Sequence, residues 1–185
     1  MLTKLGNSCI RTFTGLAFDY LDPKPSMICI EDIAHALSMV CRFAGQSREF
    51  YSVAQHSILV CEILPPCLGC EALLHDASEA YMGDMARPLK RHLPDYKQIE
   101  AGIMEAIAKK YDLPRLHDPE IKKADNIALA FEADLLMKGR VEEYGAIPDD
   151  TSIGVRKMAE NVLSFSVSPK EAEKWFLREW EGQRP

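Results

Sequence analysis

Apolar and polar positions follow a helical period along most of the chain. The first apolar stripe has Glu31 and Asp32 in its first turn, where the dipole of a helix favours acidic side chains. Its apolar residues recur every three or four positions and are Ile30, Ile33, Ala34, Leu37 and Val40. This pattern predicts a helix that begins near Ile30 and ends at Gly45.

Four more segments of the chain share this period. Ser52 is a candidate cap for a helix that stops at Leu64, because two prolines follow. Asp118 followed by a proline is a strong helix start. The predicted helices cover residues 52–64, 69–81, 96–111 and 118–139, with a turn-rich stretch at 83–90.

The two ends of the chain differ from this middle. Residues 11–20 are rich in threonine and aromatic residues around a glycine, which predicts a short β-ribbon. After Gly139, a loop of about a dozen residues is expected to lead to one or two helices. The last helix begins at Ser168-Pro169 and has Trp175 and Phe176 as its anchor. The expected fold class is mostly α: a helical bundle with a short N-terminal β-ribbon.

The composition fits one domain over residues 1–185, with 47% hydrophobic and 27% charged residues. The net charge of −6 argues against general nucleic-acid binding, which needs a basic face, but allows a small anionic substrate. No apolar run approaches the ~20 residues that span a bilayer. The first residues lack the apolar core of a signal peptide. We therefore expect a cytoplasmic protein that binds neither nucleic acids nor membranes.

The six cysteines suggest no disulfide framework. Cys41 and Cys61 fall in amphipathic runs, where cysteine acts as a small apolar residue. Cys67 and Cys70 have the spacing of half a zinc site, but a second pair is missing from the sequence. Two reduced thiols in a loop are therefore the simpler interpretation.

Two histidines and two aspartates form the most informative pattern. His75 and Asp76 are adjacent in an apolar run, while His56 and Asp125 lie in other helical segments. Alone, His56 fits a buried histidine, and Asp125, which follows two lysines, fits a solvated acid or an ion-pair partner. However, apolar positions flank Asp125, and a buried carboxylate without a partner is costly. Together the four side chains predict a site for one divalent metal.

The segments around these residues carry a family resemblance. They read SVAQHS at 52–57, LLHDASE at 73–79, GD at 83–84 and PLK at 88–90. This series resembles the HD-domain phosphohydrolases, most closely the compact branch that includes bacterial 5′-deoxynucleotidases and phage deoxynucleoside triphosphohydrolases. The likeness covers about residues 28–136, which are expected to form the metal-binding core of an HD-domain bundle.

The resemblance implies a ligand set and a cofactor. In this family the residues that match His56, His75, Asp76 and Asp125 hold the metal, and two coordination places remain for water or a phosphate oxygen. Mixed nitrogen and oxygen ligands suit a divalent transition metal, which could be Co²⁺, Mn²⁺, Fe²⁺, Ni²⁺ or Zn²⁺.

Two more acids are implied as catalytic residues. Glu79 is four residues after His75, on the same face of the predicted helix, and matches the acid or base of the family. An exposed acid at a helix end is the alternative. Asp84 follows a glycine and suits an ordinary turn. In the deoxynucleotidase relatives this position contacts the sugar, which would favour deoxyribose.

The resemblance also implies substrate contacts. Arg42, at the end of the first predicted helix, would hold a phosphate, although a cation also suits a helix C-terminus. Phe43 would stack on a base or else belong to the core. Lys90 would be a second phosphate contact, and Gln46, Arg48 and Tyr51 could line the pocket.

The expected activity is hydrolysis of the 5′-phosphoester of a deoxynucleotide. A monophosphate would give phosphate, and a triphosphate such as dATP would give triphosphate. The alternatives are a phosphodiesterase for guanosine tetraphosphate or a cyclic nucleotide, and a nucleotide-binding protein without catalysis.

The interval between His56 and His75 is shorter than in the best-known deoxynucleotidases, and this difference falls near the pocket mouth. A homo-oligomer is expected, and His35, His92 and His117 are interpreted as surface or supporting residues.

Overall fold

The computed structural model describes residues 6–138, 144, 157, 160, 162 and 167–184. It is mostly helical, with 64% helix and 5% strand, and has a small two-stranded antiparallel sheet near the N-terminus. The prediction of a mostly α fold with a β-ribbon is therefore confirmed. No helix within these residues is long and apolar enough to cross a membrane.

Between Ile30 and Leu136, short turns join the helices, and three of the helical segments between Pro25 and Leu136 are 3₁₀ helices. The helices are α1 (Ile30–Met39), α2 (Val53–Ile63), α3 (Gly69–Leu73), α4 (Glu79–Met82), α5 (Arg87–Lys90), α6 (Pro94–Tyr111), α7 (Pro119–Leu136) and α9 (Pro169–Gln183). The 3₁₀ helices are η1 (Pro25–Met27), η2 (Arg42–Gly45) and η3 (Pro66–Leu68).

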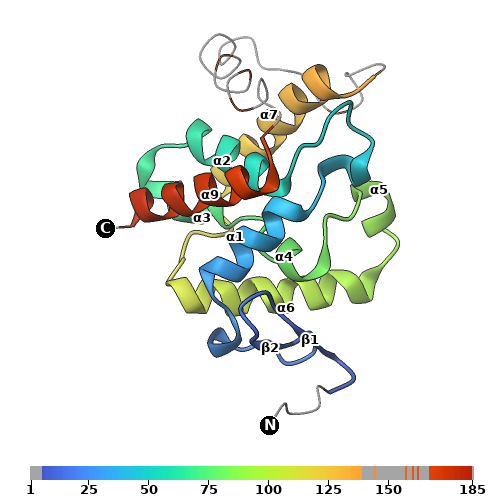
Figure 1. Ribbon diagram of the computed structural model, residues 1–185, viewed down its shortest axis with the longest axis vertical. Helices are drawn as coiled ribbons and strands as arrows, with labels where there is room; N and C mark the ends of the chain where they lie inside the picture. The colour runs from blue at the N-terminus through green and yellow to red at the C-terminus, as the bar shows by residue number, and fades with distance from the viewer. Residues whose placement is uncertain are drawn as a thin grey trace.

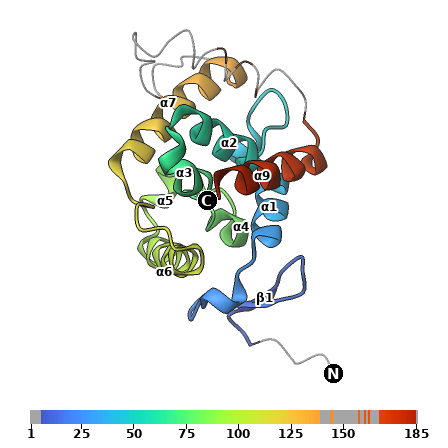
Figure 2. The ribbon, with the colours of Figure 1, turned by 90° about the vertical axis from the view of Figure 1, so that its left-hand side faces the viewer.

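Helix α2 occupies the centre of the bundle. It packs against α1, α3, α7 and α9, and every residue from Val53 to Cys61 is buried (Figures 1 and 2). Ser52 and Gln55 form a reciprocal capping box at its start, which fixes where the helix begins. A helix that is apolar on all sides can place a polar side chain only inside the protein. His56 is therefore buried by the position of α2.

The β-ribbon consists of β1 (Cys9–Arg11) and β2 (Ala17–Asp19), with Ile10 opposite Phe18. The buried Phe18 ring stacks on Tyr81 at 3.9 Å between centroids. The backbone amide of Thr14 donates a hydrogen bond to Asp32 on α1 over 2.7 Å. These contacts attach the ribbon to the helical core, next to α6 and α1 (Figure 2).

The segment 69–81 is not one helix, so that prediction was wrong. Helix α3 ends at Leu73, residues 74–78 form turns, and α4 begins at Glu79. A continuing helix would offer the Ala72 carbonyl to the amide of Asp76. That carbonyl instead faces Nδ1 of His75 at 2.7 Å. His75 and Glu79 therefore do not share a helical face as expected, and the turn places both His75 and Asp76 at the site.

The first predicted helix also ends early, at Met39 instead of Gly45. Beyond it, the amide of Arg42 donates to the carbonyl of Tyr51 at 2.8 Å, and Cys41 forms a β-bridge with Ser52. This pairing holds the chain in an extended form that a helix cannot adopt. Arg42 therefore belongs to η2 and not to the C-terminus of a helix.

Helix α9 packs on the protein's own core, against α1, α2 and α3. Ser168 forms a capping box at its start, as its sequence predicts. Phe176 is fully buried, as expected for an anchor, whereas Trp180 rather than Trp175 is the second buried aromatic residue. The predicted loop after Gly139 and any helix between it and α9 lie mainly outside the described residues. All six cysteines are free thiols.

Candidate metal centre

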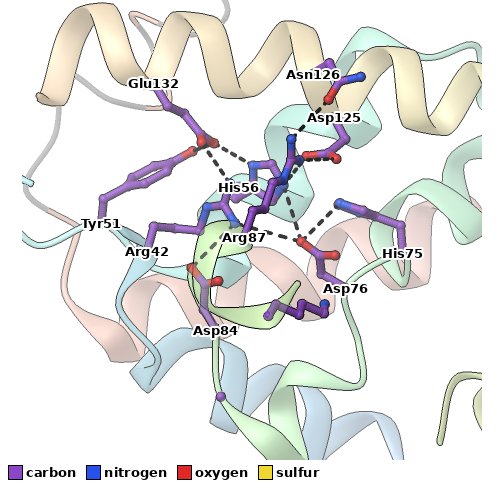
Figure 3. Close-up of polar contacts among 12 residues, drawn as sticks. Arg42, Tyr51, His56, His75, Asp76, Asp84, Arg87, Asp125, Asn126 and Glu132 are labelled. Carbon is purple, nitrogen blue, oxygen red and sulfur yellow. Dashed lines mark hydrogen bonds and ion pairs between the residues drawn. The ribbon is translucent and has the colours of Figure 1, made fainter. Parts of the chain in front are cut away.

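Four side chains from three parts of the chain converge on one point. His56 comes from α2, Asp125 from α7, and His75 and Asp76 from the turn between α3 and α4 (Figure 3). Nε2 of His56 is 3.3 Å from Oδ1 of Asp125 and 3.5 Å from Oδ2 of Asp76. Nε2 of His75 is 3.3 Å from the same Asp76 oxygen. Two imidazole nitrogens and two carboxylates therefore surround one small volume.

His56, His75 and Asp125 form a group that could hold a metal ion, because one donor atom of each lies within 4.8 Å of the others. Both Nε2 atoms are buried and have no hydrogen-bond partner among the described residues. The other ring nitrogens are engaged: Nδ1 of His56 with Glu132 at 2.5 Å, and Nδ1 of His75 with the Ala72 carbonyl. Metal-binding histidines are oriented in this way. The donor set fits a divalent metal.

The electrostatics of the group favour a cation at its centre. Burial opposes ionisation of Asp125, but the neighbouring His56 and His75 overcome this effect and lower its pKa. The pKa of Asp76 is lowered in the same way, by His75 and His56 against its burial. Burial and Arg42 oppose a charge on His56, yet Glu132 and Asp125 raise its pKa to about 9. The surroundings that favour a proton on His56 would also favour a metal cation.

Glu132 supports this centre and was not predicted from the sequence. Its fully buried carboxylate accepts hydrogen bonds from Tyr51 over 3.0 Å and from Arg42 over 3.2 Å, and it also contacts His56 (Figure 3). Although burial opposes its ionisation, His56 and Arg42 lower its pKa to about 2. Glu132 follows Asp125 by seven residues, which places both on one face of α7. That spacing is the signal that could have identified it.

We expect Glu132→Gln to lower the free energy of unfolding by about 1–3 kcal/mol, because one amide cannot serve Arg42, Tyr51 and His56 as the carboxylate does. Urea denaturation of the metal-free protein measures this loss. Glu105→Gln makes the same chemical change in an exposed ion pair and should cost less than about 0.5 kcal/mol. Equal effects of the two variants would show that the buried carboxylate has no special structural role.

A cavity of about 480 Å³ lies beside the centre. Asp76 and Asp125 line it, so two of the candidate metal ligands face this space. Six of the side chains that the sequence suggested for catalysis or substrate binding line it too: Arg42, Phe43, Gln46, Glu79, Asp84 and Lys90. Arg48 and Tyr51 do not line it, and the hydroxyl of Tyr51 points to Glu132 inside the core.

Glu79 and Asp84, the two candidate catalytic acids in this cavity, differ in their environment from ordinary surface carboxylates. Glu79 is only 6% exposed, so it is not the exposed acid at a helix end that was the alternative. Burial and then the charges of Asp76 and Asp84 raise its pKa well above the ordinary value. Burial also raises the pKa of Asp84, whose Oδ2 is 3.6 Å from Nη1 of Arg42. These surroundings favour the protonated form of Glu79.

The expected phosphate contacts already have partners within the protein. Arg42 is buried between Glu132 on one side and Asp84 and Asp76 on the other. Lys90 forms an ion pair with Glu100 and does not extend freely into the cavity. Both cations line the site, but an anion would compete with carboxylates for them.

Two cations on the Asp125 carboxylate were not anticipated. Arg87 Nη2 and Lys122 Nζ donate to its Oδ2 over 2.7 and 2.6 Å, while Oδ1 faces His56 (Figure 3). Arg87 also donates to Asn126 over 3.2 Å. The two cations hold one oxygen of Asp125 and leave the other directed at the centre.

The remaining histidines have ordinary positions. His35 stacks on Phe13 at 3.7 Å and lies 3.1 Å from Glu173, and His92 is exposed. His117 lines a smaller cavity of about 260 Å³, which His75 also lines. Among the described residues, Cys67 and Cys70 belong to no group of potential metal ligands.

No protein-family model matches the sequence. The chain is 49% identical to the uncharacterized protein YfdR of Escherichia coli, over 68% of this chain and 70% of YfdR. It is 38% identical to the uncharacterized protein RCAP_rcc00048 of Rhodobacter capsulatus, over 67% of this chain and 70% of the relative. The chain therefore belongs to the family of YfdR, and the names of these relatives state no activity.

Proposed function

We propose that this protein is a metal-dependent phosphohydrolase of the HD-domain class that cleaves the 5′-phosphoester of deoxynucleotides. The observation that supports this most strongly is the convergence of His56, His75, Asp76 and Asp125 beside a cavity that also contains a buried acid. The two unpartnered imidazole nitrogens favour a metal over a purely structural polar cluster.

These four residues would hold one divalent transition metal, such as Co²⁺, Mn²⁺, Fe²⁺, Ni²⁺ or Zn²⁺. When bound, such an ion polarises a phosphoryl oxygen and makes a coordinated water a stronger nucleophile at neutral pH. Glu132 and the Ala72 carbonyl fix the ring orientations of His56 and His75, so the ligands are positioned before the metal arrives.

The protein's own groups have distinct roles in this proposal. Glu79 would donate a proton to the 5′-oxygen that leaves, a role that suits its buried position and raised pKa. Asp84 would accept a hydrogen bond from the sugar and disfavour a 2′-hydroxyl. Arg42 would contact the phosphate that is cleaved, and Phe43 and Gln46 would line the base and sugar side.

Two alternatives remain distinct from this proposal. Another HD phosphodiesterase, for guanosine tetraphosphate or a cyclic nucleotide, would use the same centre on a different ester. A nucleotide-binding protein without catalysis would keep the metal and the cavity, but it would not need the buried Glu79 with its raised pKa. The acid therefore favours an enzyme.

The test is product analysis with the purified full chain, loaded with Co²⁺ or Mn²⁺. Deoxynucleoside should appear from dAMP or dATP, with phosphate or triphosphate as the second product. AMP and ATP should react more slowly, because Asp84 disfavours the ribose. Cyclic AMP and guanosine tetraphosphate serve as competing substrates. If no deoxynucleotide is hydrolysed with either metal, the proposal is wrong.

A further inference from the structure

The large cavity is rich in cationic side chains although the chain as a whole is acidic. The net charge of the chain is −6, yet five cationic side chains line the cavity, against four carboxylates. Two of those carboxylates, Asp76 and Asp125, belong to the candidate metal centre. Cationic side chains that line a cavity attract an anionic ligand. The five cations are Arg42, Arg87, Lys90, Arg91 and Lys122.

Helix α7 shows how the lining is ordered. Lys122, Asp125 and Leu129 follow one another along it and all line the cavity, and a rise of 1.5 Å per residue separates Lys122 from Leu129 by ~10 Å. Arg87 donates hydrogen bonds to Asp125 and Asn126, which lie in the N-terminal half of α7. Arg87, which shares Oδ2 of Asp125 with Lys122, therefore lies toward the Lys122 end. Arg91 follows it by one helical turn and lines the same cavity.

The opposite end of the cavity is apolar. The amide of Arg48 donates to the carbonyl of Leu136, so the segment that follows η2 meets the C-terminal end of α7. Phe43 of η2 contacts Tyr144 edge to face, with 6.0 Å between ring centroids. The apolar residues that line this end are Phe43, Leu129, Met137 and Tyr144, whereas Met85, Ala86 and Pro88 line the cavity beside Arg87. Asp125 thus lies between a cationic end and an apolar, aromatic end.

The cations of the first end are available to a ligand to different degrees. Arg91 is exposed and has no ion pair within the part of the chain that the structure describes. The side chains of Arg87 and Lys122 are 45% and 63% exposed and share one oxygen of Asp125. The Asp125 side chain is only 7% exposed, but both cations reach it from the solvent side and each has further N–H donors. Arg91, Arg87 and Lys122 can therefore contact an anion that enters beside the centre.

We propose that the cationic end of the cavity binds the two outer phosphates of a nucleoside triphosphate, so that the substrate is a deoxynucleoside triphosphate and not a monophosphate. The inference rests on the proposed function. The base lies at the Phe43 end, the α-phosphate at the centre beside Asp125, and the β- and γ-phosphates toward Arg87, Arg91 and Lys122. A monophosphate would leave these three cations without a ligand.

The reaction is a simple hydrolysis in which atoms and charges balance. The oxygen of a water molecule forms a bond to the α-phosphorus, and the bond from phosphorus to the 5′-oxygen breaks. The 5′-oxygen takes a proton from Glu79, which recovers one from the attacking water. The products are a deoxynucleoside and inorganic triphosphate, without an oxidant or a second substrate.

Steady-state kinetics with dATP and dAMP test the inference on the metal-loaded full chain. The kcat/KM of the wild type should be at least about tenfold higher for dATP, since a charge-assisted contact to phosphate contributes that much. Arg91→Gln, alone and with Lys122→Gln, should lower kcat/KM for dATP about tenfold more than for dAMP. Arg178→Gln, an exposed arginine on α9, is the matched control and should leave the ratio unchanged. An equal preference, or an equal loss for both substrates, overturns the inference.

Binding of inorganic tripolyphosphate provides a readout that does not depend on turnover. Calorimetry should show that tripolyphosphate binds more tightly than phosphate, and that Arg91→Gln weakens this binding while Arg178→Gln does not. If neither nucleotide is hydrolysed, the proposed function fails. Tripolyphosphate binding then still tests whether the cationic end of the cavity binds phosphates. Equal affinities of wild type and Arg91→Gln for tripolyphosphate would then overturn it. Metal content is measured for each variant, because Lys122 contacts Asp125.

Discussion

Glu79→Gln is expected to lower kcat by about 10²–10⁴-fold while the protein keeps its fold and its metal. Glutamine has nearly the same shape, but its amide cannot donate a proton and recover one in each turnover. The buried position and raised pKa of Glu79 are those of an acid that holds its proton until the leaving oxygen needs it.

The measurement is kcat on the hydrolysed deoxynucleotide, with metal content and circular dichroism of the same preparation. Glu105→Gln is the control, because it makes the same change on the exposed face of α6 and should alter kcat less than twofold, roughly the spread seen for surface substitutions. If Glu79→Gln retains most of the wild-type kcat, Glu79 is not the proton donor. Another group in the cavity would then have to protonate the 5′-oxygen.

Asp125→Ala is expected to weaken metal binding by more than about 100-fold, since even residues that only support a ligand contribute 10–100-fold. Its carboxylate comes from α7, whereas the other three candidate ligands come from α2 and the turn before α4. Without it, the centre loses the donor that closes one side, and Arg87 and Lys122 remain there as unpaired cations.

Titration of the metal-free protein with Co²⁺, followed by absorption spectroscopy, measures this loss. Asp95→Ala removes an exposed carboxylate from the first turn of α6 and should leave the affinity within about twofold of the wild type. Unchanged affinity in Asp125→Ala would remove Asp125 from the ligand set. A loss in both variants would point to nonspecific binding on an acidic surface.

Local signals predicted most of the helices. Ser52, Asp118 and Ser168 each cap a helix through a hydrogen bond to a nearby backbone amide, so a few adjacent residues define where the helix begins. The alternation of apolar and polar positions defined the buried faces of α1 and α7. These features depend on neighbours in sequence, which is why they could be predicted without the fold.

The errors arose where contacts distant in sequence or a single side chain decide the backbone. The apolar pattern continues through Leu73, Leu74 and Ala77, all buried, and it does not reveal that His75 ends α3 by engaging the carbonyl of Ala72. Pairing of Arg42 with Tyr51 likewise replaces the end of the first predicted helix with an extended segment.

The candidate site was predicted in part for the same reason. The histidines and aspartates stand out as residue types, and the resemblance of their segments to a known family connected them. Glu132 does not stand out, because one acid in a long helix is ordinary, and only the fold shows that it lies inside the protein against His56 and Arg42. The ion pairs of Arg87 and Lys122 with Asp125 depend on how α5 meets α7.

X-ray absorption spectroscopy of the Co²⁺-loaded protein tests the metal centre most directly, because it reports which atoms bind the ion. We predict a shell of nitrogen and oxygen with the scattering of two imidazole rings, and the loss of one ring in His75→Ala. A shell that contains sulfur would place the ion at Cys67 and Cys70 instead. That result, or a spectrum without imidazole, would contradict the centre formed by His56, His75, Asp76 and Asp125.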